Sequence, residues 1–298
     1  MGELLAGRVV VVTGAGSGIG RSEALEIARQ GAKVVVADLG VALDGSAESG
    51  SAARAVVAEI TEAGGAAIAC QEDVGDWDGS KRIVDTAIDA FGGIDVIVNN
   101  AGRSIRRSLH LSYDRFHDFE RTMQLNYFGA IRLVMGLLPT MRDQGSGHIV
   151  NVSSIGVQTN PPRFSAYVAS KAALDSWSNV VSSELVGDGI SFTTIHMPLV
   201  KTPMIAPTRI YDRFPTITPA QAADLVLSAM ADRPHEINTV LGNIGAVAHT
   251  LVPKTAFRVL HLAYQVFPDS AAARGDQDDE GVTSEQMFLA RVLKGGHW

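Results

Sequence analysis

Tyr167 and Lys171, in the stretch YVASK, are the residues whose types and spacing most directly suggest chemistry. In a helix, residues four positions apart lie on the same face, so the phenol and the ammonium can share one small space. A tyrosine titrates at about 10 in water, and an adjacent lysine cation favours the phenolate and lowers this pKa. We therefore expect Tyr167 to exchange a proton with a substrate, with its pKa lowered by Lys171.

A glycine-rich turn, TGAGSGIG from Thr13 to Gly20, follows the apolar run VVVV and opens a predicted helix. Its glycines allow close approach of a pyrophosphate, and the unpaired N–H groups of a helix N-terminus favour an anion. Asp38 ends the next apolar run, near the spacing of about 20 residues expected for a carboxylate on the adenosine ribose. A carboxylate there repels a 2′-phosphate. With Leu39 following it and Ser17 before Gly18, Asp38 favours NAD over NADP.

Short β-branched runs alternate with longer helical patterns along the chain, which predicts a parallel sheet. We expect a doubly wound (Rossmann) α/β domain with helices on both faces of the sheet. This domain is assigned to residues 1–245, and residues 246–298 are expected to form a helical C-terminal extension with an acidic, mobile segment at 276–281. Strands are expected at residues 8–13, 32–38, 66–70, 94–100, 147–154 and 190–197. Helices are expected from about residues 18, 52 and 79, and over 113–142 and 165–186.

The composition excludes several classes of protein. The 298 residues, 46% of them hydrophobic, carry a formal net charge of -7 without a Lys/Arg block, so a nucleic-acid binder is not expected. Cys70 is the single cysteine, which excludes an internal disulfide and a cysteine-based metal cluster. The eight histidines lack ligand spacing, so no metal is expected, and His148 and His196 are assigned to a strand end or the core. Without a signal peptide or a membrane span, we expect a soluble, cytoplasmic protein.

Five motifs in order, over about Arg8 to Pro203, resemble the short-chain dehydrogenase/reductase family. They are TGAGSGIG, NNAG (Asn99 to Gly102), the asparagine of LNYFG, NVSS (Asn151 to Ser154) and YVASK. The resemblance implies that Tyr167 is the catalytic acid/base, Ser154 orients the substrate oxygen, Lys171 contacts the nicotinamide ribose, and Asn126 holds a water beside Lys171. Ser154 is preferred to Ser153 for its spacing from Tyr167.

The same resemblance implies a set of cofactor contacts and an oligomer. One position departs from the family, which commonly has Pro-Gly after the sixth strand where this chain has Pro198-Leu199. Relatives are usually homo-tetramers or homo-dimers. The expected cofactor-binding residues are Gly14, Ser17, Gly18, Ile19, Gly20, Asp38, Leu39, Asp73, Val74, Asn100, Ala101, Gly102, Tyr167, Lys171, Pro198, Val200 and Thr202.

The part of the chain from about Asn99 is similar to the reductase domain of bacterial fatty acyl-CoA reductases, whereas the N-terminal third resembles NAD-linked hydroxyacyl-CoA and hydroxysteroid enzymes. Both resemblances imply a hydrophobic substrate, long-chain or steroid-like. The favoured interpretation is an NAD(H)-dependent oxidoreductase that interconverts an alcohol and a ketone or aldehyde. The alternatives are an NADPH-dependent fatty aldehyde or fatty acyl-CoA reductase and a non-catalytic dinucleotide-binding regulator.

Two later segments bear on the substrate. The family resemblance implies that the proline-rich segment after Pro198 forms a lid over the substrate. Its apolar residues would suit an acyl chain or ring: Met204, Ile205, Ile210, Tyr211 and Phe214. Over residues 254–267, the polar residues Lys254, Arg258, His261 and Gln265 form one stripe and almost all others are apolar. This apolar surface requires a cover: the domain itself, a second subunit, a lipid-like substrate or, as a peripheral contact, a membrane surface.

Overall fold

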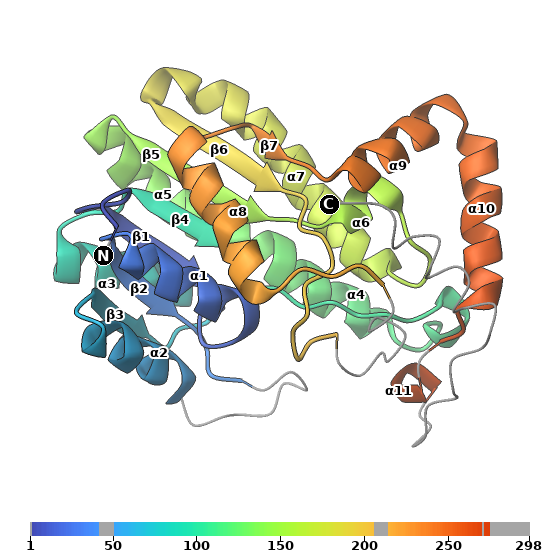
Figure 1. Cartoon of the computed structure of the whole chain (residues 1–298), viewed down its shortest axis with the longest axis horizontal. Helices are drawn as coiled ribbons and strands as arrows, with labels where there is room; N and C mark the ends of the chain where they lie inside the picture. Colours follow the sequence, from blue (N-terminus) through green and yellow to red (C-terminus); the bar gives the residue numbers. More distant parts are fainter. Residues whose placement is uncertain (1, 42–50, 206–213, 270, 275–298) are drawn as a thin grey trace.

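The computed structural model describes residues 2–41, 51–205, 214–269 and 271–274, and its centre is a parallel sheet. Seven strands pair in the order β3-β2-β1-β4-β5-β6-β7 (Figure 1). The expected doubly wound fold is confirmed. The strands are β1 (Val9–Thr13), β2 (Lys33–Ala37), β3 (Ala66–Cys70), β4 (Val96–Asn99), β5 (Gly147–Val152), β6 (Ile190–Ile195) and β7 (Glu236–Ile237).

Helices cover both faces of the sheet. The hydrophobic cluster on one face includes α1 (Gly18–Arg29), α2 (Ser51–Glu62) and α8 (Pro219–Asp232). The cluster on the other face includes α3 (Trp77–Phe91), α5 (Ala130–Gln144) and α7 (Ser165–Leu185). The remaining helical segments are η1 (Leu109–Leu111), α4 (Phe116–Met123), η2 (Gln124–Gly129), α6 (Ile155–Thr159), η3 (Val186–Asp188), α9 (Val240–Leu251), α10 (Pro253–Val266) and α11 (Ala271–Arg274).

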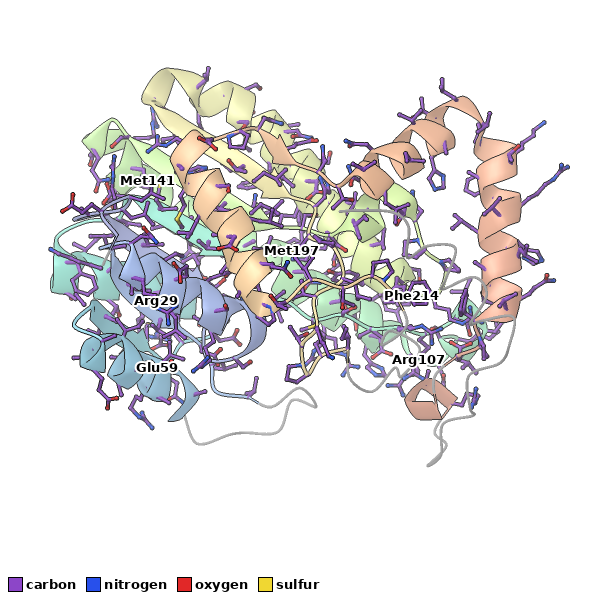
Figure 2. All side chains as sticks on the ribbon, in the orientation of Figure 1. Arg29, Glu59, Arg107, Met141, Met197 and Phe214 are labelled. Atoms are coloured by element: carbon purple, nitrogen blue, oxygen red, sulfur yellow. The ribbon has the colours of Figure 1, made fainter. Side chains whose placement is uncertain are left out.

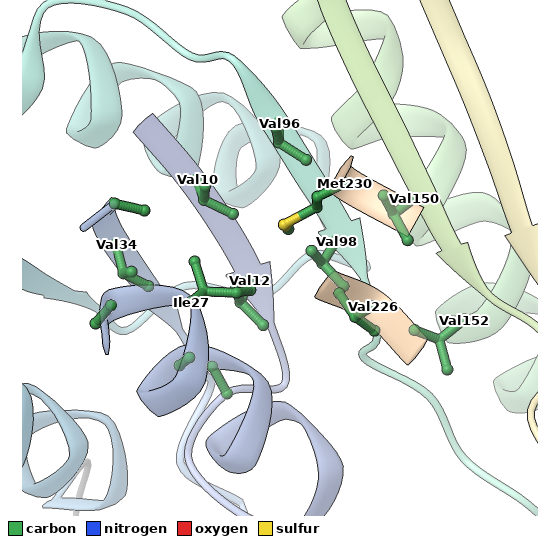
Figure 3. Close-up of a cluster of buried hydrophobic side chains, with 14 of the residues drawn as sticks. Val10, Val12, Ile27, Val34, Val96, Val98, Val150, Val152, Val226 and Met230 are labelled. Atoms are coloured by element: carbon green, nitrogen blue, oxygen red, sulfur yellow. The ribbon is translucent and has the colours of Figure 1, made fainter. Parts of the chain in front are cut away.

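The valine run in β1 explains why this strand lies inside the sheet, between β2 and β4. Val10 and Val12 pack in the cluster with α1 and α8 (Figure 3). Val9 and Val11 pack in the cluster with α3 and α5 on the other face. Successive side chains of a strand point to opposite faces, so a continuous apolar run suits a strand covered on both sides. Each fully buried valine contributes about 1.5 to 3 kcal/mol relative to an exposed one. β1 therefore holds the loop that follows it in a rigid place.

Three elements differ from the sequence-based expectation. The single helix expected over 113–142 is divided into α4, η2 and α5, because η2 is a π-helical segment that adds a residue to the turn. The two-residue strand β7 was not expected, since so short a run leaves no periodicity. Helix α9 runs across the boundary expected between residues 245 and 246. The division into domain and extension therefore stays a proposal.

Several predicted features lie outside the described residues. These are most of the loop after β2, the lid residues Ile210 and Tyr211, and the acidic segment at 276–281 with the residues that follow it. Met204 and Phe214, on either side of the undescribed part of the lid, are described. Phe214 contacts Phe267 at the end of α10, with ring centroids 5.6 Å apart. An aromatic contact thus joins the segment expected to form the lid to the end of α10.

Candidate active site

The candidate site lies where the strand order reverses, between the carboxyl ends of β1 and β4. Thr13, the last residue of β1, accepts hydrogen bonds through Oγ1 from the backbone N–H groups of Asn100 (3.1 Å) and Ala101 (3.0 Å). The side-chain amide of Asn100 donates to Thr13 O at 2.9 Å. In doubly wound sheets, ligands bind in the crevice at this switch point. These bonds join the glycine-rich turn to the NNAG segment and hold both at the crevice.

The glycine-rich turn is built so closely that side chains would not fit at Gly14, Gly16 or Gly20 without displacing a neighbour. Gly14 has a φ of +64°, and a Cβ there would lie 2.9 Å from Ala101 Cα. A Cβ at Gly20 would lie 2.3 Å from Gly14 O. Gly18, with a φ of +56°, faces open space in which Thr202 Cγ2 is the nearest atom, at 3.8 Å. Ser17 begins α1 without a side-chain cap, so the first N–H groups of the helix remain available for a pyrophosphate.

Asp38 lies directly after β2, and two backbone groups orient its carboxylate. Gly16 N–H donates to Oδ2 and Gly40 N–H donates to Oδ1, each at 2.8 Å. An ionised carboxylate has about four lone-pair sites, so two remain for ribose hydroxyls. A Cβ at Gly16 would lie 2.8 Å from Asp38 Cγ, which explains this glycine. Sequence reasoning omitted Gly16 from the cofactor set, although its place in the turn was a visible signal.

The Tyr167 phenol and the Ser154 hydroxyl are neighbours, and Ser154 acts on the pKa of the phenol. Ser154 Oγ also accepts from Gly156 N–H at 3.0 Å, which begins the short helix α6. Burial raises the pKa of Tyr167, and this effect exceeds the lowering by Ser154; the carboxylate of Asp175 adds to the rise. The expectation that Lys171 lowers this pKa is therefore wrong in this structure. The phenol is a proton donor held neutral at neutral pH.

Lys171 is buried beside the NNAG segment. Its Nζ donates to Val152 O at 2.7 Å, and a Cβ at Gly102 would lie 3.5 Å from Nζ. Burial lowers the pKa of Lys171 to about 8, against the opposing charges of Asp175 and Glu23. Val152 is the last residue of β5, so this hydrogen bond fixes the position of Nζ at the carboxyl end of that strand. A cation therefore lies next to Gly102 at the site.

Asn126 lies in the π-helical segment η2 and binds the backbone that follows Gly102. Its Oδ1 accepts from Arg103 N–H at 2.8 Å, and its Nδ2 donates to Arg103 O at 2.9 Å. Nδ2 also donates to Ser170 Oγ at 2.9 Å, and Ser170 donates in turn to Tyr167 O. Single π turns are frequent at functional sites because they change the direction of one side chain. Here Asn126 connects the NNAG segment to the helix that carries Tyr167 and Lys171.

A scan against protein-family models matches residues 8–211 to the short chain dehydrogenase family. The chain belongs to the short-chain dehydrogenase family. The matched span contains all four residues expected to be catalytic, and it ends before α8. The resemblance given by the five motifs is therefore confirmed, and with it the class of an oxidoreductase that binds NAD(P).

Similar proteins agree with this family. The chain is 45% identical to a fatty acyl-CoA reductase of Acinetobacter baylyi over 296 residues, 99% of this chain and 97% of that protein. It is also 44% identical to an oxidoreductase of Mycobacterium tuberculosis, over 100% of this chain and 86% of that protein. Among solved structures, a 7α-hydroxysteroid dehydrogenase complexed with NADH and 7-oxoglycochenodeoxycholic acid matches with a TM-score of 0.70 and 28% identity, over 80% of this chain and 95% of that one.

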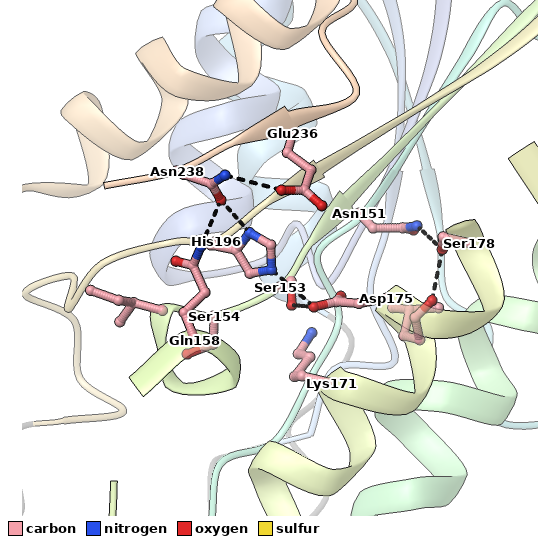
Figure 4. Close-up of polar contacts among 12 residues, drawn as sticks. Asn151, Ser153, Ser154, Gln158, Lys171, Asp175, Ser178, His196, Glu236 and Asn238 are labelled. Atoms are coloured by element: carbon pink, nitrogen blue, oxygen red, sulfur yellow. Dashed lines mark hydrogen bonds and ion pairs between the residues drawn. The ribbon is translucent and has the colours of Figure 1, made fainter. Parts of the chain in front are cut away.

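Figure 4 shows a polar network of this short-chain dehydrogenase that sequence reasoning missed, around Asp175 on the helix that carries Lys171. Asp175 Oδ2 accepts from Ser153 Oγ at 2.9 Å and lies 3.1 Å from His196 Nε2. His196 Nδ1 lies 2.6 Å from Asn238 Oδ1. Burial lowers the pKa of His196, but bonding to Asp175 outweighs this and the pKa is raised. Asp175 follows Lys171 by one helical turn, and this spacing was a usable signal.

Glu23 is a second missed group of this short-chain dehydrogenase. It lies in α1 and is fully buried, and neither carboxylate oxygen has a hydrogen-bond partner among the described residues. Burial raises the pKa of Glu23 to about 8, and the charge of Lys171 opposes the rise. An acid on the buried face of an amphipathic helix is rare unless it is paired. That position, between the buried residues Gly20 and Ala24, was the signal in the sequence.

The other expected cofactor residues take different positions around the crevice. Val74 is buried and lines a small cavity with Thr13 and Ala101. Asp73 accepts from Gly75 N–H at 2.7 Å, whereas Leu39 is 40% exposed. Pro198 and Val200 are buried, and Val200 belongs to the core cluster, so its side chain faces the protein. Ile19 is partly buried and packs against the same cluster.

An arginine cluster lies next to the NNAG segment of this short-chain dehydrogenase. The buried carboxylate of Asp118 forms ion pairs with Arg107, Arg115 and Arg121. Burial would raise the pKa of Asp118, but the hydrogen bond of Arg115 and the charge of Arg121 hold it below its usual value. Arg107 also donates to Ala273 O at 2.8 Å, and Figure 2 places it near α11. One acid thus faces three paired arginines.

Arg103 adds a further cation to this cluster. Its guanidinium is half-buried and has no hydrogen bond or ion pair among the described residues. Burial lowers the pKa of Arg103, the charge of Arg121 lowers it further, and Asp118 acts against both. A desolvated cation beside a like charge is unfavourable unless an anion accompanies it. The site of this short-chain dehydrogenase therefore has an excess of positive charge next to Gly102.

Proposed function

We propose that this short-chain dehydrogenase uses NAD(H) to interconvert a fatty-chain alcohol and its aldehyde or ketone. The observation that carries the proposal is the placement of the Ser154 hydroxyl beside the Tyr167 phenol, because a neutral phenol next to a second hydroxyl is what protonation of a carbonyl oxygen requires. When bound, the nicotinamide supplies or accepts the hydride. The proton transfer and the orientation of the substrate oxygen are assigned to side chains of the protein.

Tyr167 is assigned the proton transfer. In the reducing direction its hydroxyl donates a proton to the substrate oxygen as negative charge develops there, and Ser154 donates a second hydrogen bond to the same oxygen. Lys171, whose Nζ lies beside Gly102, is assigned the contact with the nicotinamide ribose. Asp175 lies one turn away and favours the charged form of Lys171. In the oxidising direction the same groups act in reverse.

The choice of NAD(H) is supported by Asp38. The two N–H bonds to its carboxylate hold it at the end of β2, where a 2′-phosphate would meet a negative charge. We expect Asp38→Ala to decrease the preference for NADH over NADPH by about a hundredfold, because a desolvated like-charge contact costs several kcal/mol. The measurement is kcat/KM for both cofactors with one substrate.

The matched control for the cofactor prediction is Asp73→Ala. Asp73 is expected near the adenine, which both cofactors share, so this change should affect NADH and NADPH equally. Tighter binding of NADPH by the unchanged protein, or an unaltered preference in Asp38→Ala, would contradict the assignment of NAD(H).

The fatty-chain substrate is supported by the similar proteins and by the aromatic contact of the lid. A fatty acyl-CoA reductase is 45% identical, and a solved relative holds a steroid, 7-oxoglycochenodeoxycholic acid. Phe214 and Phe267 bring two aromatic rings together beside the segment expected to cover the substrate. A series of primary alcohols and aldehydes should show kcat/KM rising by about fourfold per methylene until the pocket is filled. A profile independent of chain length would contradict this substrate class.

A second candidate, reduction of a fatty acyl-CoA thioester, is favoured by Arg103. The half-buried guanidinium and the arginines around Asp118 would suit the phosphates of coenzyme A, which a free aldehyde lacks. We expect Arg103→Gln to raise KM for an acyl-CoA by about tenfold or more, since one charge-assisted hydrogen bond contributes about 1.5 to 3 kcal/mol. KM for the aldehyde of equal chain length should stay the same. Arg142→Gln, which alters an exposed pair with Asp188, is the control.

An equal rise in KM for the acyl-CoA and for the aldehyde in Arg103→Gln would mean that Arg103 supports the local structure near Asn126 and does not bind coenzyme A. No turnover of acyl-CoA by the unchanged protein, together with turnover of the aldehyde, would leave the first candidate in place and remove the second.

A further inference from the structure

Helices α9 and α10 form an arm at one side of the molecule. In Figure 1, α9 leads away from the sheet and α10 stands at the edge of the structure. α9 packs on α6, and α10 contacts α9. The far end of α10 is held by Arg163, whose guanidinium lies 4.0 Å from the centre of the Tyr264 ring and donates to Tyr264 O. The arm therefore has an inner side that contacts the domain and an outer side that none of the described residues covers.

The uncovered side of α9 is apolar. Val240, Ile244, Val247 and Leu251 recur at spacings of four, three and four, so they form one row along the helix. Each of these side chains is 55 to 73% exposed. Val259 and Leu262 continue the pattern on α10, at 61 and 55% exposed. Packing of the arm against its own domain does not cover these side chains in the described structure.

The polar side chains of the arm are basic or neutral. Lys254, Arg258, His261 and Gln265 form a row on α10, all four of them exposed. At about 100° per residue, this row lies directly beside the one containing Val259 and Leu262. Between Glu236 and Asp269 the sequence contains no acidic residue, although the whole chain carries a net charge of -7. The arm is thus the apolar and cationic part of an acidic protein.

This charge pattern distinguishes the possible partners of the arm. A two-fold contact with a second copy sets the same patch against itself, so the cations of one arm would face an arm that contains no acid to neutralise them. A substrate molecule is too small to cover both helices. An anionic lipid surface provides an apolar layer for the exposed rows and phosphates for the cations. None of the described helices is long and apolar enough to cross a membrane, so the contact would be peripheral.

We propose that α9 and α10 dock this protein on the surface of an anionic lipid bilayer. The apolar row of α9, which begins at Val240, and Val259 and Leu262 of α10 insert at the boundary between headgroups and acyl chains. Lys254 and Arg258 bind lipid phosphates. This assignment is independent of the substrate, because it depends on the arm alone.

The test is co-sedimentation of the full-length protein with lipid vesicles. We expect binding to vesicles that contain phosphatidylglycerol, weakening as salt is added, and little binding to pure phosphatidylcholine. The double variant Lys254→Gln/Arg258→Gln should bind anionic vesicles about thirtyfold more weakly, at about fivefold for each basic residue lost. The variant Ile244→Ser/Leu262→Ser should also lose binding. Arg142→Gln, a matched loss of an exposed cation on α5, should bind like the unchanged protein.

Two further measurements complete the test. NADH titration establishes that each variant is folded, and light scattering after size exclusion gives the oligomeric state. Equal binding of the Lys254/Arg258 variant and the unchanged protein would overturn the proposal. Failure of the unchanged protein to bind anionic vesicles would also overturn it. The same holds if the unchanged protein does not bind vesicles and its oligomer dissociates in the variant Ile244→Ser/Leu262→Ser. That last result would assign the arm to a second copy.

Discussion

Tyr167→Phe is expected to lower turnover by about a thousandfold and to leave NADH binding unchanged, because removing a general acid or base costs about 10² to 10⁴ in rate. The substitution removes the hydroxyl that Ser154 contacts and keeps the ring, so the packing of Tyr167 against Phe164 persists. The measurement is the rate of NADH oxidation with a long-chain aldehyde, beside a fluorescence titration of NADH. Since burial raises the pKa of Tyr167, the rate of alcohol oxidation by the unchanged protein should also increase with pH.

Tyr113→Phe is the matched control for this prediction. Tyr113 is 77% exposed and its hydroxyl contacts His110, so the same atom is removed away from the site. Its turnover should equal that of the unchanged protein. Retained activity in Tyr167→Phe would refute the assigned mechanism. An unchanged protein that binds NADH and turns over none of the alcohols, aldehydes or thioesters tested would instead favour the regulator.

Glu23→Gln is the second large effect, and it concerns stability. Burial raises the pKa of Glu23 to about 8, above its value in the unfolded chain. The folded state therefore retains a proton that the unfolded state has released, so the stability of the unchanged protein decreases as pH rises from about 4.5 toward the folded pKa. Gln cannot ionise. We expect the free energy of unfolding of Glu23→Gln to gain roughly 3 kcal/mol over the unchanged protein between about pH 5 and about pH 7.5.

The measurement is urea unfolding of both proteins at a series of pH values. The change with pH is decisive, because a buried Gln amide also lacks partners and adds an offset that pH does not alter. Glu62→Gln, at an exposed position of the neighbouring helix α2, should show no such change with pH. If the free energies of unfolding of Glu23→Gln and of the unchanged protein change with pH in parallel, the Glu23 carboxylate has a hydrogen-bond partner or is reached by solvent.

Much of the sheet and the centre of the site could be predicted from local patterns. The valine runs of β1 and β2 indicated buried parallel strands, and Tyr167, Ser154 and Asp38 were found from motif and spacing alone. These features could be predicted because each depends on residues that are close together in the sequence. The position of Gly18 at the start of a helix is of the same kind.

The features that could not be predicted depend on contacts between distant elements. The pKa of Tyr167 is set by burial and by Asp175, whereas the sequence suggested Lys171, which bonds to Val152 on another strand. Glu23 was passed over because helical periodicity predicts where a residue faces and not whether its carboxylate finds a partner. The orientation of Arg103 likewise depends on Asn126, 23 positions away.

The π-helical segment Gln124–Gly129 means that the length of this part of the chain is itself under constraint. Removing one residue from it would restore an ordinary α-helix. Because the π turn takes up one extra residue, α4 would keep Asp118 and α5 would keep Leu137 on their buried faces after such a deletion. Asn126 would change direction, and its bonds to Arg103 and Ser170 would be lost. A single-residue deletion here should therefore preserve the helices and disturb the site, so turnover should fall more than the free energy of unfolding.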